Sequence, residues 1–172
     1  MRPIRIYFEG DIRLKPGLTK SLGDDSRVKV IAGKNKPETE KDFELGRVKH
    51  RDCLVLLLVD SDEPVPKASN DPCRFHMIEI MESWFLADRE ALARHFGAGF
   101  KAAALPGNPA RIESIPKRDV EQGLDNATRE SRKRKYSYDK AGHGRDLLII
   151  VDSAKVRKAS PECERFFQAL SL

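Results

Sequence analysis

Two aspartates that follow an apolar segment are the residues of this sequence with the clearest chemical potential. Residues 53–59 read CLVLLLV, and Asp60, Ser61 and Asp62 come directly after them. An unbroken apolar run that ends in turn-forming residues is typical of a parallel strand covered on both faces. Two carboxylates one residue apart in a turning segment can bind one hard cation, such as Mg²⁺ or Mn²⁺. Asp also serves simply as a turn residue or helix cap, so the pattern by itself leaves both interpretations open.

A third acidic residue has the same kind of position near the start of the chain. Residues 4–9 alternate between apolar and polar side chains, as strands do, and Gly10 follows Glu9. In an open α/β sheet the carboxyl ends of parallel strands share one edge, where ligands bind. We therefore expect Glu9 to meet Asp60 and Asp62 at that edge, although they are far apart in the sequence.

The order of the expected elements favours such a sheet. Residues 27–32 are typical of a second strand, and the charged residues 38–49 of a surface helix. Pro16 and Gly17 predict a loop over residues 11–22, with at most a short helix after Gly17. We predict an α/β fold in which a mostly parallel central sheet is flanked by helices and joined by right-handed crossovers.

The remainder of the chain is expected to be mainly helical. Residues 65–72 look like a polar loop, and residues 74–87 like a strand to about residue 80 followed by a short helix. Asp88 is the expected N-cap of a helix over residues 89–96, which Gly97 ends. Residues 117–128 and a segment that starts at Ser160 and Pro161 are predicted helices, whereas the apolar residues 147–151 have no assignable period. We expect one domain over residues 1–172, with the core sheet in 1–96 and a basic extension in 97–172.

Composition limits the classes of function. The chain has 32 Lys and Arg against 27 Asp and Glu, a formal net charge of +5, which favours nucleic acid over anionic membrane as a partner. The three cysteines form no CxxC pair, which argues against a zinc or redox centre. No apolar segment approaches the roughly 20 residues that span a bilayer, and the charged first residues are unlike a signal peptide. We therefore expect a cytoplasmic protein without a membrane partner.

A basic segment over residues 129–140 contains two tyrosines among its cations. Lysine and arginine can bind phosphates while an aromatic ring stacks on a base. We predict nucleic-acid contacts for Arg132, Lys133, Arg134, Lys135, Tyr136 and Tyr138. A solvated loop has a similar composition, so this interpretation has a plain alternative.

Several motifs together resemble a known group of proteins. The residues YFEG at positions 7–10 and LVDSD at positions 58–62 resemble the Toprim domain of topoisomerases, primases and related nucleases. The residues MESWFLAD at positions 81–88 resemble the signature of small stand-alone Toprim-like proteins, grouped as domain-of-unknown-function family 4276. That group also tends to carry a Pro-Lys pair, here at 116–117, and a Tyr-x-Lys-x-x-His stretch, here at 138–143.

The resemblance implies a Toprim-like, Rossmann-like fold with a metal-dependent phosphodiester site, as in a nuclease that acts on DNA or RNA. It implies that Asp60 and Asp62 bind Mg²⁺ or Mn²⁺ and that Glu9 shares the metal or moves a proton. Glu82 is a further candidate ligand. Where the pattern usually has another acidic residue a few positions after the Glu-Gly pair, this chain has Asp11 directly after it, which leaves the number of metals open.

The resemblance also extends to the C-terminal part of the chain. Lys140 and His143 become candidates for contacting the scissile phosphate, and Lys117 for binding nucleic acid. The other histidines, His50, His76 and His95, have no metal-ligand spacing and receive no role.

Other functions fit parts of the pattern. A phosphatase of the haloacid-dehalogenase type would use Asp60 as nucleophile, but Pro64 stands where that family has Thr or Val. A glycosyltransferase DxD motif has no further support in the chain. In a different class, the chain can be a non-catalytic nucleic-acid-binding or regulatory subunit that needs a partner such as an ATPase, in a defence or mobile-element system.

Overall fold

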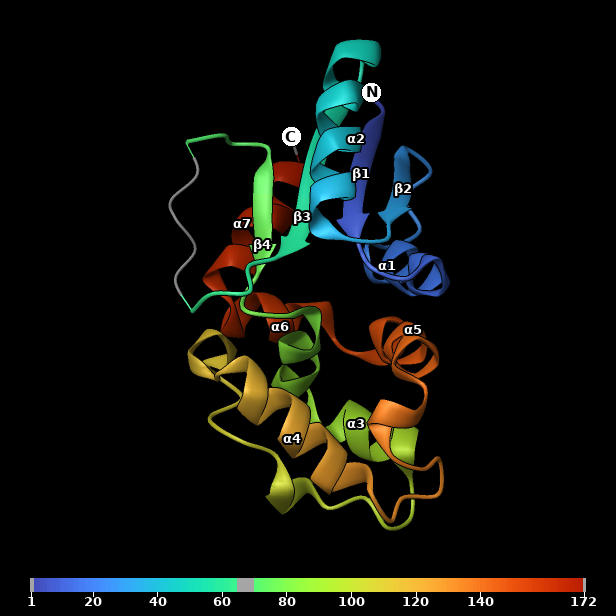
Figure 1. Cartoon of the computed structure of the whole chain (residues 1–172), viewed down its shortest axis with the longest axis vertical. Coiled ribbons are helices and arrows are strands. Elements are labelled where there is room, and N and C mark those ends of the chain that lie inside the picture. Colours follow the sequence, from blue (N-terminus) through green and yellow to red (C-terminus); the bar gives the residue numbers. More distant parts are fainter. Residues whose placement is uncertain (1, 65–69, 172) are drawn as a thin grey trace.

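The computed structural model describes residues 2–64 and 70–171 and contains a four-stranded parallel sheet (Figure 1). Its strands are β1 (Ile4–Glu9), β2 (Val28–Gly33), β3 (Leu54–Asp60) and β4 (Arg74–Met77). They lie in the order β2-β1-β3-β4, and each neighbouring pair is parallel. The predicted α/β fold with a parallel central sheet is therefore confirmed.

The strand that was predicted to reach about residue 80 ends earlier, at Met77. The reason is local to the end of β3. The backbone N–H of Asp62 donates to the carbonyl of Glu79, and the N–H of Met81 donates to the side chain of Asp60. The residues after Met77 therefore stay bonded to the end of β3, but through these irregular contacts and not through a regular strand ladder. The loop predicted over residues 65–72 lies mostly outside the described residues.

Helix α2 (Lys36–Lys49) packs against one face of the sheet and begins two residues before the prediction (Figure 1). Phe43 of α2 is buried against Tyr7, with the two rings edge to face at 6.4 Å. Gly46 allows this close packing, because a Cβ at that position would lie 2.3 Å from the Tyr7 hydroxyl. A small second core made mainly of β1 and β3 side chains lies under α2.

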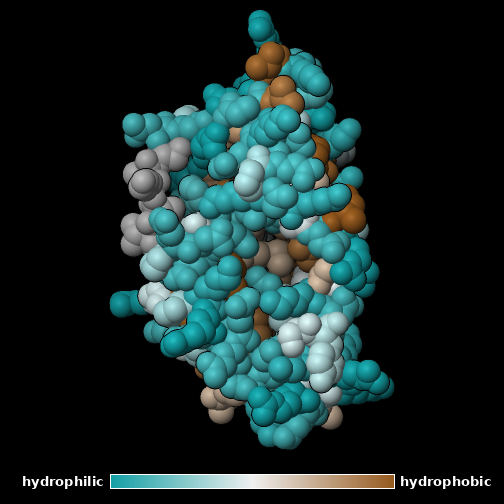
Figure 2. Space-filling view, viewed as in Figure 1, coloured by the Kyte–Doolittle hydropathy of each residue, from teal (hydrophilic) through white to brown (hydrophobic). Residues whose placement is uncertain are grey.

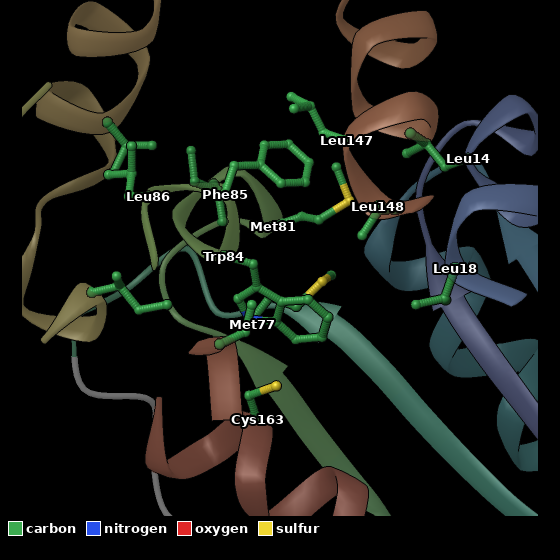
Figure 3. Packing of buried hydrophobic residues seen from close by; sticks show 14 of the residues in the cluster. Leu14, Leu18, Met77, Met81, Trp84, Phe85, Leu86, Leu147, Leu148 and Cys163 are labelled. Atoms are coloured by element: carbon green, nitrogen blue, oxygen red, sulfur yellow. The ribbon is translucent and has the colours of Figure 1, made fainter. Parts of the chain in front are cut away.

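The larger core lies on the opposite face and continues into the helical half of the molecule (Figure 3). Helix α7 (Pro161–Leu170) packs on β4, where the rings of Phe166 and Phe75 meet at 5.4 Å. The predicted start of α7 is confirmed, since the Ser160 side chain accepts a hydrogen bond from the backbone N–H of Cys163. The same buried cluster includes Ile6 of β1 and Leu124 of α4 (Lys117–Thr128), so sheet and helices share one apolar interior.

Helix α1 (Lys15–Ser21) replaces the loop that Pro16 and Gly17 predicted. Pro16 lies in the first turn, where its missing N–H has no partner to lose. Gly17 faces helix α5 (Lys140–Ile150), and a Cβ at Gly17 would lie 2.4 Å from the carbonyl oxygen of Arg145. The glycine therefore permits close approach of the two helices and does not interrupt α1.

The helices beyond the sheet form the half of the molecule that faces the carboxyl ends of the strands (Figure 1). Helix α3 (Arg89–Phe96) begins with Asp88 as a side-chain cap and ends at Gly97, whose φ is +69°, as predicted. Short 3-10 segments cover Met81–Ala87, Ala102–Ala104, Ile112–Ser114 and Tyr136–Tyr138. Helix α6 (Ser153–Ala159) was not predicted.

Helix α5 accounts for the residues that follow the basic segment. Gly142, His143 and Gly144 all lie in its first turns. Asp139 caps this helix by accepting from the N–H of Gly142. The unassigned apolar residues 147–150 are its last turn, buried in part against α1 and α3. None of the helices in the described residues is long and apolar enough to cross a membrane.

Candidate acidic site at the ends of the central strands

Two of the predicted acidic residues lie where a ligand site is expected in this topology. The chain passes from β1 to β2 on one side and then returns past β1 to β3 on the other, so the connection switches direction between β1 and β3. Glu9 is the last residue of β1 and Asp60 the last residue of β3. In open α/β sheets the crevice outside the carboxyl ends at such a switch point is the usual ligand site.

Glu9 is bound directly to the end of β3. Its Oε2 atom accepts a hydrogen bond from the backbone N–H of Asp60 at 3.1 Å. Burial raises the pKa of Glu9; the Asp60 N–H opposes this, and the charges of Asp62 and Lys36 act in opposite directions. The net result is a carboxyl that holds its proton more readily than an exposed glutamate does.

Among the acids of the site, Asp60 has the most strongly shifted pKa. Its Oδ1 atom accepts the backbone N–H of Met81 at 2.9 Å. Burial and then the negative charges of Glu82 and Glu9 raise the pKa of Asp60 to about 8. Burial and the neighbouring negative charges together thus outweigh the hydrogen bond from Met81, which favours the ionised form.

Asp62 faces two lysines. Its carboxylate lies 3.3 Å from the Nζ atom of Lys117 and 3.8 Å from that of Lys36. Lys36 Nζ also donates to the carbonyl oxygen of Asp60 at 2.8 Å. Lys117 is the first residue of α4, and its backbone N–H donates to Glu79 at 2.9 Å. The structure thus brings Lys117 to the edge formed by Glu9, Asp60 and Asp62, referred to below as the acidic edge. It also places Lys36 there, which the sequence did not indicate because the position of Lys36 depends on how α2 packs.

Glu82 approaches from the 3-10 segment that follows β4. Its Oε1 atom accepts a hydrogen bond from the hydroxyl of Tyr136 at 3.2 Å. The ring of Tyr136 is buried against Phe85 and His143, with 2% of the residue exposed. A ring with so little exposed surface is not accessible for stacking on a base, contrary to the expectation from the basic segment. Tyr136 instead orients Glu82.

The basic segment is only partly free to contact a ligand. Lys135 is paired with Asp125 at 2.9 Å, and Lys140 with Glu121 at 3.1 Å. Arg132, Lys133 and Arg134 lie on the surface, and Tyr138 is 74% exposed. Lys140 and Glu82 line one hollow of about 340 Å³, so the end of the basic segment shares a hollow with one of the predicted acidic ligands.

His143 belongs to a separate polar chain between α3 and α5. Lys133 Nζ lies 3.2 Å from His95 Nδ1, and His95 Nε2 lies 2.9 Å from His143 Nδ1. An ammonium group can only donate, so His95 carries its proton on Nε2 and donates to His143, whose own proton is on Nε2. Burial and the charge of Lys133 lower the pKa of His95 to about 4. No hydrogen bond in the described residues links His143 to the acidic edge.

The donor atoms at the edge are carboxylate oxygens, which suit Mg²⁺ or Mn²⁺. In residues 2–64 and 70–171, however, no three His, Cys, Asp or Glu side chains are grouped so that they could hold a metal ion. Magnesium is often bound by only one or two carboxylates, with waters and substrate phosphates as the other ligands. The arrangement of Glu9 and Asp60 therefore fits a cation whose remaining ligands are waters and the phosphate of a bound substrate.

Comparison with known proteins gives a family without an assigned activity. A family model described as "Domain of unknown function (DUF4276)" matches residues 13–171. The predicted resemblance to domain-of-unknown-function family 4276 is thus confirmed. The match begins after Glu9 and Gly10, so this pair of residues lies outside it. No curated protein and no solved structure matches this chain.

Proposed function

We propose that this chain, which belongs to the DUF4276 family, is a Toprim-like, Mg²⁺- or Mn²⁺-dependent nuclease that cleaves a phosphodiester bond. The carrying observation is the partly buried Asp60 carboxyl at the strand switch. Burial and the neighbouring carboxylates raise its pKa to about 8. A divalent cation would offset the repulsion among these carboxylates. When bound, it supplies stabilisation of the negative charge that develops on a phosphoryl oxygen.

Glu9 and Asp60 are the residues that would hold the cation, with Glu82 as a third carboxylate within electrostatic reach of Asp60. The N–H of Met81 and the hydroxyl of Tyr136 orient Asp60 and Glu82, respectively. Because each carboxylate is held by a donor from a neighbouring segment, little reorganisation is needed when a cation enters.

Lys36 and Lys117 are suited to bind the phosphodiester. Both ammonium groups lie at the mouth of the acidic edge, and Asp62 holds them there. Asp62 is half exposed, so a phosphate oxygen can displace its carboxylate from either lysine. The two roles of Glu9 exclude each other: if Asp60 and Glu82 hold the cation without it, the raised pKa of Glu9 suits it to take the proton of the attacking water as the phosphorus–oxygen bond to the leaving group breaks.

The test is a cleavage assay with labelled single-stranded and double-stranded DNA and RNA, in Mg²⁺, Mn²⁺ or a chelator. We expect cleavage only with a divalent cation, and a loss of at least about 100-fold in Asp60→Asn. Asp52→Asn is the matched control, because Asp52 is an exposed acid just before the opposite end of β3. Equal cleavage by Asp60→Asn and wild type would refute the proposal.

One observation favours a second candidate function. Because the described residues contain no complete ligand group, the chain can instead be a nucleic-acid-binding or regulatory subunit that a partner such as an ATPase completes. Nucleic-acid binding without cleavage under every divalent cation supports this second function. For either function we propose that the protein acts in the cytoplasm, in a defence or mobile-element system.

A further inference from the structure

Helix α4 and the segment that leads into α5 form a groove of about 470 Å³ lined by residues with charged or polar groups, referred to below as the α4 groove. Most of the surface of this half of the molecule is hydrophilic in the view of Figure 2. The charged side chains that line the α4 groove are Arg118, Glu121, Asp125, Arg129, Lys135 and Lys140. Cations thus outnumber acids along its walls.

Each acidic side chain of the α4 groove already forms an ion pair with a lysine. Lys140 pairs with Glu121 and Lys135 pairs with Asp125, which also accepts the backbone N–H of Ser137 at 3.0 Å. The positive charge in excess therefore belongs to two guanidinium groups on α4.

These two guanidinium groups belong to Arg118 and Arg129. Arg118 is 88% exposed and has only a 3.4 Å contact with the adjacent Asp119, while Arg129 donates to the side-chain oxygen of Asn126. Eleven residues are close to three helical turns, so both lie on the same face of α4, roughly 16 Å apart along its axis. That spacing lets both contact phosphates of one extended strand.

The α4 groove adjoins a second hollow that reaches Glu82. Ser137 and Lys140 line both the α4 groove and the hollow of about 340 Å³ that contains Glu82. Tyr138 lines that hollow as well and is 74% exposed, in contrast to the buried Tyr136. An accessible aromatic ring thus lines the hollow next to the α4 groove.

We propose that the α4 groove binds single-stranded nucleic acid, with Arg118 and Arg129 on its phosphates and Tyr138 stacked on a base. This inference rests on the proposed function and names its substrate class. In a duplex the faces of the bases are stacked on one another, so the Tyr138 ring has no base to contact. Single strands expose every base, and stacking on aromatic side chains beside a cationic groove is how proteins bind them.

The experiment measures binding separately from cleavage. Fluorescence anisotropy with labelled DNA and RNA single strands of about 16 nucleotides, and with the matching duplexes, is recorded in EDTA. The variants are Tyr138→Ala, Tyr138→Phe and the double variant Arg118→Ala/Arg129→Ala, all at exposed positions. Arg51→Ala, an exposed cation before the amino end of β3, is the matched control.

We expect a single strand to bind at least about 10-fold more tightly than the duplex, and Tyr138→Ala to lose about 10-fold while Tyr138→Phe retains binding. In the double arginine variant the negative slope of log affinity against log salt becomes less steep by about 1.4, because two phosphate contacts are lost. Arg51→Ala binds as wild type does.

Duplex binding as tight as single-strand binding, or groove variants that match Arg51→Ala, would overturn the inference. Binding that depends on the α4 groove without any cation-dependent cleavage leaves the inference standing and removes the nuclease function. Cleavage that depends on Asp60 while the groove variants bind normally removes the inference alone.

Discussion

Replacing Asp60 by Asn should stabilise the protein at neutral pH when no divalent cation is present. Asn keeps an oxygen for the N–H of Met81, which Asp60 Oδ1 accepts at 2.9 Å, but it cannot ionise. The folded-state pKa of Asp60 is raised to about 8 from 3.8, so the folded protein retains a proton that the unfolded chain releases above about pH 4. Asp60 therefore makes folding progressively less favourable as the pH rises from about 4 to about 8.

The size of the effect follows from the pKa difference. Each pH unit in that interval costs about 1.4 kcal/mol, so the penalty reaches about 4 kcal/mol at pH 7. Asn removes this dependence, and the free energy of unfolding of Asp60→Asn should exceed that of wild type by up to this amount. Near pH 4, where Asp60 is neutral in both states, the two proteins should be similar.

Urea unfolding followed by circular dichroism, in EDTA at several pH values between about 4 and 8, measures this difference. Asp62→Asn is the control, because its half-exposed carboxylate contacts Lys117 and Lys36 and its removal brings no gain at pH 7. Parallel pH profiles for Asp60→Asn and wild type, or a less stable variant at pH 7, would refute the reasoning. Added Mn²⁺ should then stabilise wild type more than Asp60→Asn, since binding to the folded state raises its stability by mass action.

Three further predictions concern the scaffold around the site. Asp88→Ala should lower the free energy of unfolding by about 3 kcal/mol in urea titrations. The 2% exposed carboxylate accepts one hydrogen bond from Ala91 within α3 and two, from Asp152 and Lys155, that join α3 to α6. A loss below about 1 kcal/mol contradicts this. Gly17→Ala should lower the free energy of unfolding by about 1 to 3 kcal/mol in the same assay, since its Cβ would meet the carbonyl oxygen of Arg145. An unchanged free energy of unfolding contradicts the close contact between α1 and α5. Nitrogen-15 NMR should find His95 and His143 neutral at pH 7, each with its proton on Nε2, and His95 should titrate near pH 4. A proton on Nδ1 of either ring contradicts the hydrogen-bond chain.

Features that depend on neighbouring residues could be read from the sequence. The apolar run before Asp60 predicted a buried central strand, and strict alternation predicted β1, because side chains alternate between faces along a strand. Asp88 and Ser160 predicted helix starts, since a cap bonds N–H groups only a few residues away. The shared position of Glu9 and Asp60 followed from the rule that parallel strands end at one edge.

Features that depend on contacts between distant segments were decided by tertiary structure. Pro16 and Gly17 are common in loops, and only the approach of α5 shows why they occur in a helix. Tyr136 and Tyr138 differ by two positions in a polar segment, yet one is buried against Phe85 and the other is exposed. Local sequence carries no information on which of two similar rings the core will accommodate, because burial is determined by the packing of elements far apart in the chain. For the same reason, the pairing of Asp62 with two lysines could not be foreseen from the acidic motif.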